Sequence, residues 1–264
     1  RGLMLKSLAL FLQEKKETYY AISYATGATR SDSWIDIEGG IGNLFTYASL
    51  RREFADQSFH IDGGPIKLSQ AGSFSGQHIM VPKHGIAIHI NSFNFPIWGM
   101  LEKIAVNLLA GVPAVVKPSE YTSFLTEAVV RDIIDSRILP EGALQLVSGK
   151  GIGILDSVQR GDTVTFTGSA KTGLSLKSSA HYLERGVPFN LEADSLNAMV
   201  MGEDVKPESS EFKIFIKEVS REITVKAGQK CTAVRRILVP KESIDAVGEA
   251  LKNRLESTKY GDPN

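Results

Sequence analysis

Three polar side chains in this sequence are suited to chemistry on an electrophilic carbon: Cys231, Glu192 and Asn94. A cysteine thiolate is a strong nucleophile, and nearby cations favour the ionised form of the thiol. Cys231 is the single cysteine of the chain, and Lys230 and Arg235 lie close to it in sequence. The alternative interpretation is an unreactive, buried thiol that fills space in the core as a small apolar group.

Glu192 and Asn94 have the side chains of a general base and of a hydrogen-bond donor. Glu192 follows an apolar run, within Asn-Leu-Glu-Ala-Asp-Ser at 190–195, and open α/β sheets place catalytic groups where parallel strands end. Asp194 competes with Glu192 for that role, and a carboxylate at a strand end can also be merely hydrated. The Asn94 amide, in Ser-Phe-Asn-Phe-Pro at 92–96, is either a turn former or a donor to a developing oxyanion.

Two further segments are candidates for binding a nucleotide. Phe-Thr-Gly-Ser at 166–169 leads from an apolar run through Gly168 into a predicted helix, which presents backbone N–H groups to an anion. It matches neither the G-x-G-x-x-G fingerprint nor a P-loop, so a glycine in a tight turn is the alternative. Lys117 and Glu120, in Lys-Pro-Ser-Glu, follow another apolar run, where they either hold ribose hydroxyls or are hydrated.

Short strands that alternate with helices must position these residues. Apolar runs predict strands at 85–90, 114–116, 144–147, 163–166 and 188–191. The segments between them predict helices at 100–108, 124–136, 154–158 and 172–180. This alternation indicates parallel βαβ units, so we expect an α/β fold with a doubly wound, mostly parallel sheet.

The regions on either side of this sheet have other patterns. Apolar spacing predicts helices at 3–24, 35–52, 211–227 and 243–256, and a strand at 236–240. Glycines 39, 40 and 42 weaken the prediction of the helix at 35–52, because glycine has a low helix propensity. Between residues 54 and 83, glycines separate short alternating stretches, which predicts a hairpin or an extended arm.

Composition narrows the possible functions. The 264 residues include 30 basic and 30 acidic side chains, and this balance gives no electrostatic basis for binding nucleic acid or a membrane surface. No apolar stretch approaches the ~18–20 residues of a membrane span. The five histidines lack metal-ligand spacing, so we expect no metal. A single cysteine cannot form an intramolecular disulfide, which favours a reducing, cytoplasmic compartment.

The order of these motifs along the chain resembles the aldehyde dehydrogenase superfamily. The motifs are Asn-Phe-Pro at 94–96, Lys-Pro-Ser-Glu at 117–120, Phe-Thr-Gly-Ser at 166–169, Glu192, and Gly-Gln-Lys-Cys at 228–231. The segments at 34–40, 91–96, 98–103, 192–197 and 226–233 resemble PaaZ/PaaN-type proteins of phenylacetate degradation, which oxidise a CoA-linked semialdehyde. Most of the superfamily has Glu-Leu-Gly-Gly at the general base, whereas this chain has Glu-Ala-Asp-Ser. The difference favours this branch and makes Asp194 the weaker base candidate.

The resemblance implies a domain plan. It places a Rossmann-type NAD(P)-binding domain at 1–58 and 81–195, an oligomerisation arm at 59–80, and the start of a second α/β catalytic domain at 196–264. The arm implies a homo-oligomer that is at least a dimer. The family's catalytic domain continues beyond the cysteine with a Glu-Xaa-Phe-Gly-Pro segment that is not found here, and the chain begins with Arg1 rather than Met. We therefore expect a fragment of a longer enzyme, inactive when expressed alone.

The resemblance also implies a reaction and its residues. Cys231 is the implied nucleophile, Glu192 the base and Asn94 the oxyanion donor in NAD- or NADP-dependent oxidation of an aldehyde, expected to be CoA-linked, to the acid. The implied cofactor contacts are Lys117, Ser119, Glu120, Gly168 and Ser169. Glu120 repels the 2′-phosphate of NADP whereas Lys117 attracts it, so both cofactors stay open. The alternatives are a CoA-acylating dehydrogenase, which generally lacks this Glu, and a noncatalytic nucleotide-binding module.

Overall fold

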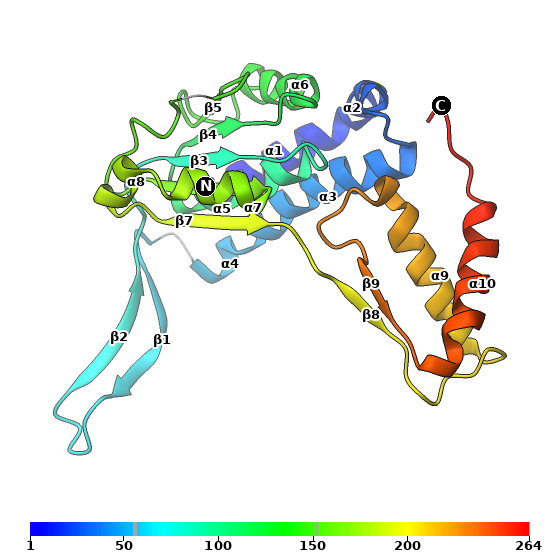
Figure 1. Ribbon diagram of the computed structural model, residues 1–264. Coiled ribbons are helices and arrows are strands. Elements are labelled where there is room, and N and C mark those ends of the chain that lie inside the picture. The colour runs from blue at the N-terminus through cyan, green and yellow to red at the C-terminus, as the bar shows by residue number, and fades with distance from the viewer. Residues whose placement is uncertain (55–56, 152, 264) are drawn as a thin grey trace.

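A five-stranded parallel sheet organises the computed structural model, which describes residues 1–54, 57–151 and 153–263. Residues 55, 56 and 152 of the predicted NAD(P)-binding domain and residue 264 of the predicted catalytic segment therefore lie outside the described residues. The strands are β3 (Ala87–Ile90), β4 (Ala114–Lys117), β5 (Leu144–Leu146), β6 (Thr163–Gly168) and β7 (Phe189–Ala193). The predicted α/β fold with a doubly wound parallel sheet is confirmed (Figure 1).

The direction of winding reverses at the centre of this sheet. The strand order is β5-β4-β3-β6-β7, so the chain adds strands first on one side of β3 and then on the other. Ile90 at the end of β3 is paired with Lys117 on one side and Phe166 on the other, so these strands end at the same edge. Open α/β sheets bind ligands at such a reversal, outside the carboxyl ends of the strands.

Helices cover both faces of the sheet. One face packs in a large apolar core against α1 (Gly2–Glu14), α2 (Lys16–Ser23), α3 (Arg30–Ser49), α5 (Trp98–Ala110) and α6 (Ser123–Asp135). The other face packs in a second core with residues 154–158 and with α7 (Ala170–Lys177) and α8 (Ala180–Arg185). Burial on both faces explains why β4 reads as a nearly continuous apolar run.

Several predicted helices have other boundaries. The predicted helix at 3–24 is two helices that meet at Lys15, followed by the 3-10 turn η1 (Tyr24–Thr26). Residues 154–157 form turns and Val158 has irregular backbone, so no helix forms there. The helix predicted at 172–180 ends at Lys177. The helix predicted at 211–227 is α9 (Ser210–Thr224), which ends where Val225 takes an extended backbone conformation. Lys226 and Ala227, in the turn η2 (Val225–Gly228), then take left-handed backbone angles.

Helix α3 corrects the second helix prediction, because it starts at Arg30 and runs through all three of its glycines. These glycines do not break the helix. A Cβ atom on Gly39 would lie 2.2 Å from Cζ3 of Trp98 in α5, and one on Gly40 would lie 3.0 Å from the Trp98 Cα. The missing side chains therefore let the two helices pack closely, and this contact outweighs the low helix propensity of glycine.

Gly39 and Gly42 provide a matched test of this packing. Gly39→Ala is expected to lower the free energy of unfolding by about 1–3 kcal/mol, because the new methyl group overlaps the Trp98 ring. Gly42→Ala on the same helix meets no atom within 4 Å, so a gain of about 0.5–1 kcal/mol is expected from helix propensity. Urea denaturation measures both, and a Gly39→Ala protein as stable as Gly42→Ala would contradict the packing argument.

Two smaller units flank the sheet (Figure 1). After the short helix α4 (Arg51–Phe54), strands β1 (His60–Lys67) and β2 (Ser75–Met80) pair antiparallel in a largely exposed hairpin, as predicted. Strands β8 (Ala198–Val200) and β9 (Arg236–Leu238) pair in parallel, and α9 and α10 (Ile244–Glu256), which follows η3 (Lys241–Ser243), pack together in a third apolar core. In the described part of the chain, no helix has the length and apolar character needed to cross a membrane.

Candidate active site

Cys231 lies in the loop between η2 and β9 with its side chain exposed. The alternative of a buried thiol that fills the core is therefore wrong. Asn197, in the link between β7 and β8, donates from its side-chain amide to the Cys231 carbonyl at 2.5 Å and to the Ala233 carbonyl at 3.2 Å. The backbone N–H of Cys231 has no acceptor among the described residues. The loop thus holds an accessible thiol beside a free N–H donor.

The two basic side chains close to Cys231 in sequence bind groups in and around the same loop. The Lys230 ammonium pairs with Glu222 of α9 at 2.8 Å, and its side chain is only 10% exposed. Arg235 donates to the carbonyls of Gly228 and Lys230 at 3.3 and 3.2 Å. The Lys230 ammonium and the Arg235 guanidinium thus each bind another group. These contacts do not support the prediction that the two cations favour the ionised form of the Cys231 thiol.

Asn94 lies beside the cysteine loop although it is far away in sequence. Its side-chain amide donates to the carbonyl of Gln229 at 2.9 Å, across 135 residues, and its side-chain oxygen accepts from the Ser92 hydroxyl at 2.6 Å. A carboxamide has two N–H groups, so the second remains for another acceptor. The Asn94 amide and the Cys231 N–H are therefore two donors that the fold brings to one region.

The two candidate carboxylates have different surroundings. Glu192 lies within β7, one residue before its end, and is exposed. Its carboxylate has no hydrogen-bond partner among the described residues. Asp194 takes a left-handed φ of 53° and accepts the N–H of Ala170 at 3.3 Å. Asp194 thus helps to hold the start of α7, whereas the Glu192 carboxylate is available to act on a water or a ligand.

The predicted nucleotide contacts lie at the carboxyl ends of β4 and β6, on either side of β3. Lys117 is the last residue of β4, and its side chain packs over Gly151 in the loop after β5. Ser119 and Glu120 follow in the loop before α6, and Glu120 is exposed. Gly168 ends β6, and the Ser169 hydroxyl accepts the N–H of Thr172 at 3.2 Å as the N-cap of α7.

Two side chains at the same sheet edge have buried polar atoms without a partner among the described residues. These atoms are the amide nitrogen and oxygen of Asn91 and the hydroxyl of Thr167. Asn91 directly follows β3, its N–H donates to the Lys117 carbonyl at 2.9 Å, and Thr167 lies in β6. Unpaired buried polar groups are costly, so this edge is suited to a polar ligand. Sequence reasoning missed both residues, because polar residues at strand ends are common.

The comparison with known proteins agrees with this geometry. The whole chain, residues 1–264, matches the model of the aldehyde dehydrogenase family. The chain belongs to the aldehyde dehydrogenase family. The family resemblance predicted from the motif order is thereby confirmed.

Relatives of this aldehyde dehydrogenase chain include two semialdehyde dehydrogenases. It is 40% identical over its whole length to 3,4-dehydroadipyl-CoA semialdehyde dehydrogenase of Aromatoleum evansii, covering 51% of that protein. It is 26% identical over 85% of its length to 3-succinoylsemialdehyde-pyridine dehydrogenase of a Pseudomonas species, covering 43% of it. The chain thus spans about half the length of the curated relatives it matches.

Solved structures show the same fold. The NAD⁺ complex of betaine aldehyde dehydrogenase from Staphylococcus aureus superposes with a TM-score of 0.83 at 24% identity, covering all of this chain and 50% of that one. The NADP⁺ complex of succinic semialdehyde dehydrogenase from Streptococcus pyogenes superposes with a TM-score of 0.83 at 19% identity, covering 55% of that chain. These similarities establish the aldehyde dehydrogenase fold for the described residues.

A buried carboxylate fixes the start of α5, which follows the Asn94 loop of this aldehyde dehydrogenase chain. Asp36 of α3 accepts the N–H groups of Ile97 and Trp98, at 3.2 and 2.8 Å. Burial raises the pKa of Asp36 to about 6, although the Lys226 ammonium and the two N–H donors oppose that rise. Burial also lowers the pKa of Lys226, and the Asp36 and Asp32 carboxylates oppose that shift.

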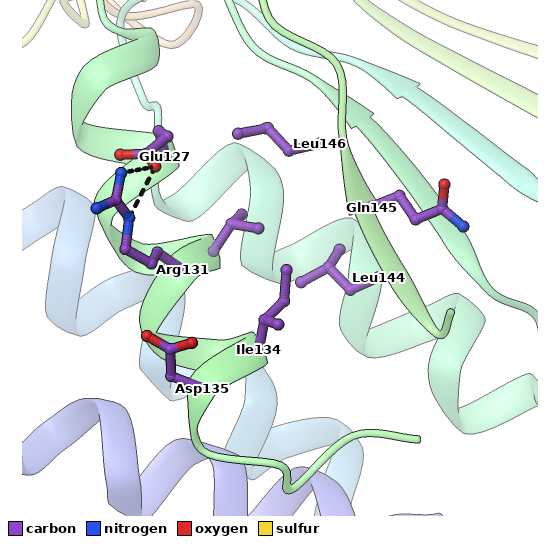
Figure 2. A pocket seen from close by; sticks show the side chains of 8 residues that line it. Glu127, Arg131, Ile134, Asp135, Leu144, Gln145 and Leu146 are labelled. Atoms are coloured by element: carbon purple, nitrogen blue, oxygen red, sulfur yellow. Dashed lines mark hydrogen bonds and ion pairs between the residues drawn. The ribbon is translucent and has the colours of Figure 1, made fainter. Parts of the chain in front are cut away.

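A shallow groove of about 400 Å³ lies elsewhere on this aldehyde dehydrogenase fold, between α6 and β5 (Figure 2). Its lining includes Leu144, Leu146 and Ile134, and Arg131 donates from Nε to Glu127 at 2.9 Å beside it. None of the predicted site residues lines this groove. The candidate chemistry is therefore at the carboxyl edge of the central strands, not in this groove.

Proposed function

We propose that the full-length protein oxidises an aldehyde to a carboxylic acid with NAD or NADP, using Cys231 as the nucleophile. The observation that carries the proposal is the 2.9 Å hydrogen bond from Asn94 to Gln229, which joins a donor amide to the cysteine loop. Because the chain spans about half of its relatives, we assign the activity to the whole protein. We expect the 264 residues alone to produce no NAD(P)H.

Cys231 and Asn94 act first. The exposed Cys231 thiolate attacks the aldehyde carbon, a C–S bond forms, and the carbonyl π electrons move to oxygen. The resulting oxyanion accepts hydrogen bonds from the free N–H of the Asn94 amide and from the backbone N–H of Cys231. Donors that are already in place when the charge develops lower the barrier, because they need no reorganisation.

The cofactor is held at the reversal point of the sheet. Lys117, Ser119 and Glu120 would contact the adenosine ribose, and Gly168 and Ser169 would lie near the pyrophosphate. The unpaired polar atoms of Asn91 and Thr167 support a polar group at this edge. A bound nicotinamide supplies the acceptor for the hydride that leaves the substrate carbon. Cys231 then holds the acyl group as a thioester.

Glu192 completes the reaction as the general base. Its carboxylate, which has no partner among the described residues, removes a proton from water, and the hydroxide attacks the thioester carbon. The C–S bond breaks, the acid leaves, and the Cys231 thiolate is restored. The CoA-acylating alternative transfers the acyl group to CoA instead, and the available Glu192 favours hydrolysis.

We propose a CoA-linked semialdehyde as the substrate, and a cytoplasmic homo-oligomer as the working form. A relative that is 40% identical over the whole chain bears the name of a CoA semialdehyde dehydrogenase, which supports the substrate class. Hairpin β1–β2 exposes apolar side chains that include Ile66, Leu68 and Phe74, at 60, 55 and 63%. Apolar exposure of this extent suits contact with another subunit.

Absorbance at 340 nm tests the proposal on the full-length protein. We expect NAD(P)H formation with a CoA-linked semialdehyde, and a lower kcat/KM for the same semialdehyde without CoA, because contacts to the CoA group are lost. The product is expected to be the free acid even when CoA is added. An acyl-CoA product would establish the CoA-acylating alternative. If no aldehyde gives NAD(P)H, the noncatalytic nucleotide-binding module is the alternative that stands.

A further inference from the structure

A left-handed turn immediately precedes the loop that carries Cys231. The φ angles of Lys226 and Ala227 are both 52°, and that of Gly228 is 72°. Only glycine adopts this region without a steric cost. Contacts from elsewhere in the chain must therefore hold Lys226 and Ala227 in place.

These contacts come from the first turns of α3. Asp32 accepts the backbone N–H of Lys226 at 2.9 Å. The Asp32 carboxylate is itself fixed by Thr29, whose hydroxyl donates to it at 2.8 Å. The buried Asp36, one turn further along α3, attracts the Lys226 ammonium together with Asp32. Asp32 thus holds the backbone of this lysine, and both carboxylates give the surroundings of its ammonium a negative charge.

Lys226 also reaches the loop that carries Asn94. Its ammonium lies 4.7 Å from the centre of the Phe95 ring, a cation–π contact. Phe95 directly follows Asn94, and the Asn94 amide donates to Gln229, three residues after Lys226. Lys226 therefore contacts the loop of Asn94 and directly precedes the loop of Cys231. In the proposed mechanism, these two side chains act on the same reacting carbonyl group.

We infer that Lys226 is a positioning residue that sets the Cys231 loop against the Asn94 amide. Its catalytic consequence rests on the proposed function, whereas the placement of the loop is a property of the folded chain. The positive charge is the essential feature, because the two carboxylates and the ring face all attract a cation. A neutral side chain of similar length would keep the packing and lose that attraction.

The first test uses Lys226→Met in the full-length protein. We expect kcat to fall roughly 10–100-fold, because a small displacement of reacting groups is that costly, while the aldehyde KM changes by less than about threefold. Lys226→Arg keeps the charge and is expected to restore most of the rate. Lys213→Met changes an exposed lysine of α9 and should match the parent. A folded Lys226→Met protein with a parental kcat overturns the inference.

A double-mutant cycle separates positioning from a general loss of structure. In an Asn94→Ala background, Lys226→Met is expected to have little further effect on kcat, because the donor that it positions is already absent. If the effects of Lys226→Met and Asn94→Ala on kcat, expressed as free energies, add in full, the inference is contradicted. If Lys226→Met fails to fold, Asp32→Asn, which weakens the hold on the same turn, replaces it in the cycle with the same expectation.

Alkylation of Cys231 distinguishes a failure of this inference from a failure of the proposed function. The rate of reaction with iodoacetamide, without cofactor or aldehyde, is expected to differ between Lys226→Met and the parent. If the alkylation rates differ but the full-length protein has no dehydrogenase activity, the proposed function is refuted. The inference that Lys226 positions the Cys231 loop is then supported. Equal alkylation rates together with equal turnover in an active enzyme would refute the placement and keep the function.

Discussion

Cys231→Ser is expected to lower NAD(P)H formation by the full-length protein roughly 10⁴-fold or more, the effect of removing a catalytic nucleophile. A serine hydroxyl stays protonated near neutral pH and is a much weaker nucleophile than a thiolate, so it does not replace Cys231. Because Cys231 is exposed and its contacts run through the backbone carbonyl, the substitution is expected to leave the fold unchanged. Initial rates at saturating aldehyde and cofactor measure the effect.

The neighbouring Thr232→Ser is a suitable control for this substitution. Thr232 is exposed and has no role in the mechanism, so its variant is expected to retain the parental rate. Unfolding curves for both variants should coincide with that of the parent. A Cys231→Ser protein that kept a tenth or more of the activity, as an order-of-magnitude limit, would remove Cys231 from the mechanism and return it to the role of an inert thiol.

Glu192→Gln is expected to slow steady-state turnover by about 10²–10⁴-fold, the usual contribution of a general base. The amide keeps the size of the side chain but cannot take a proton from water. Formation of the thioester does not require this base in the proposed mechanism, so rapid mixing should still show a burst of NAD(P)H equal to the concentration of active sites. A stopped-flow absorbance trace measures the burst and the slow phase together.

Asp194→Asn distinguishes the two carboxylates that compete for the role of base. Asp194 accepts the N–H of Ala170, and an asparagine oxygen accepts the same bond, so turnover is expected to fall only slightly. The assignment would be reversed if Asp194→Asn showed the burst and slow phase while Glu192→Gln turned over normally. Normal turnover in both variants would exclude a carboxylate base from this part of the chain.

The sheet could be predicted from the sequence because its strands are short apolar runs separated by turn residues. The runs around Ile88, Val115 and Val164 are rich in β-branched residues, which favour strands, and all three lie in strands. The helices were less predictable. Gly39 and Gly40 weakened the prediction for α3, because Trp98, whose ring and backbone they approach, lies in another helix. Only a tertiary contact explains their position.

The residue types of the candidate site could be predicted from the sequence. The residues that hold the site in position could not. The motif order indicated Cys231, Glu192 and Asn94, and the structure brings the Asn94 amide to the cysteine loop. The part played by Asp36 has no sequence signal, because a single acidic residue within an amphipathic helix normally faces water. Its burial and its bonds to α5 follow from the packing of two helices far apart in sequence.

The most direct test of the covalent mechanism is the intact mass of Glu192→Gln full-length protein after one turnover with a CoA-linked semialdehyde and NAD(P). The account predicts that the acylated protein accumulates, with the added mass on the peptide that contains Cys231, and that Cys231→Ser abolishes it. Continued acid formation by the Cys231→Ser protein, or an acyl group on another residue, would contradict the account.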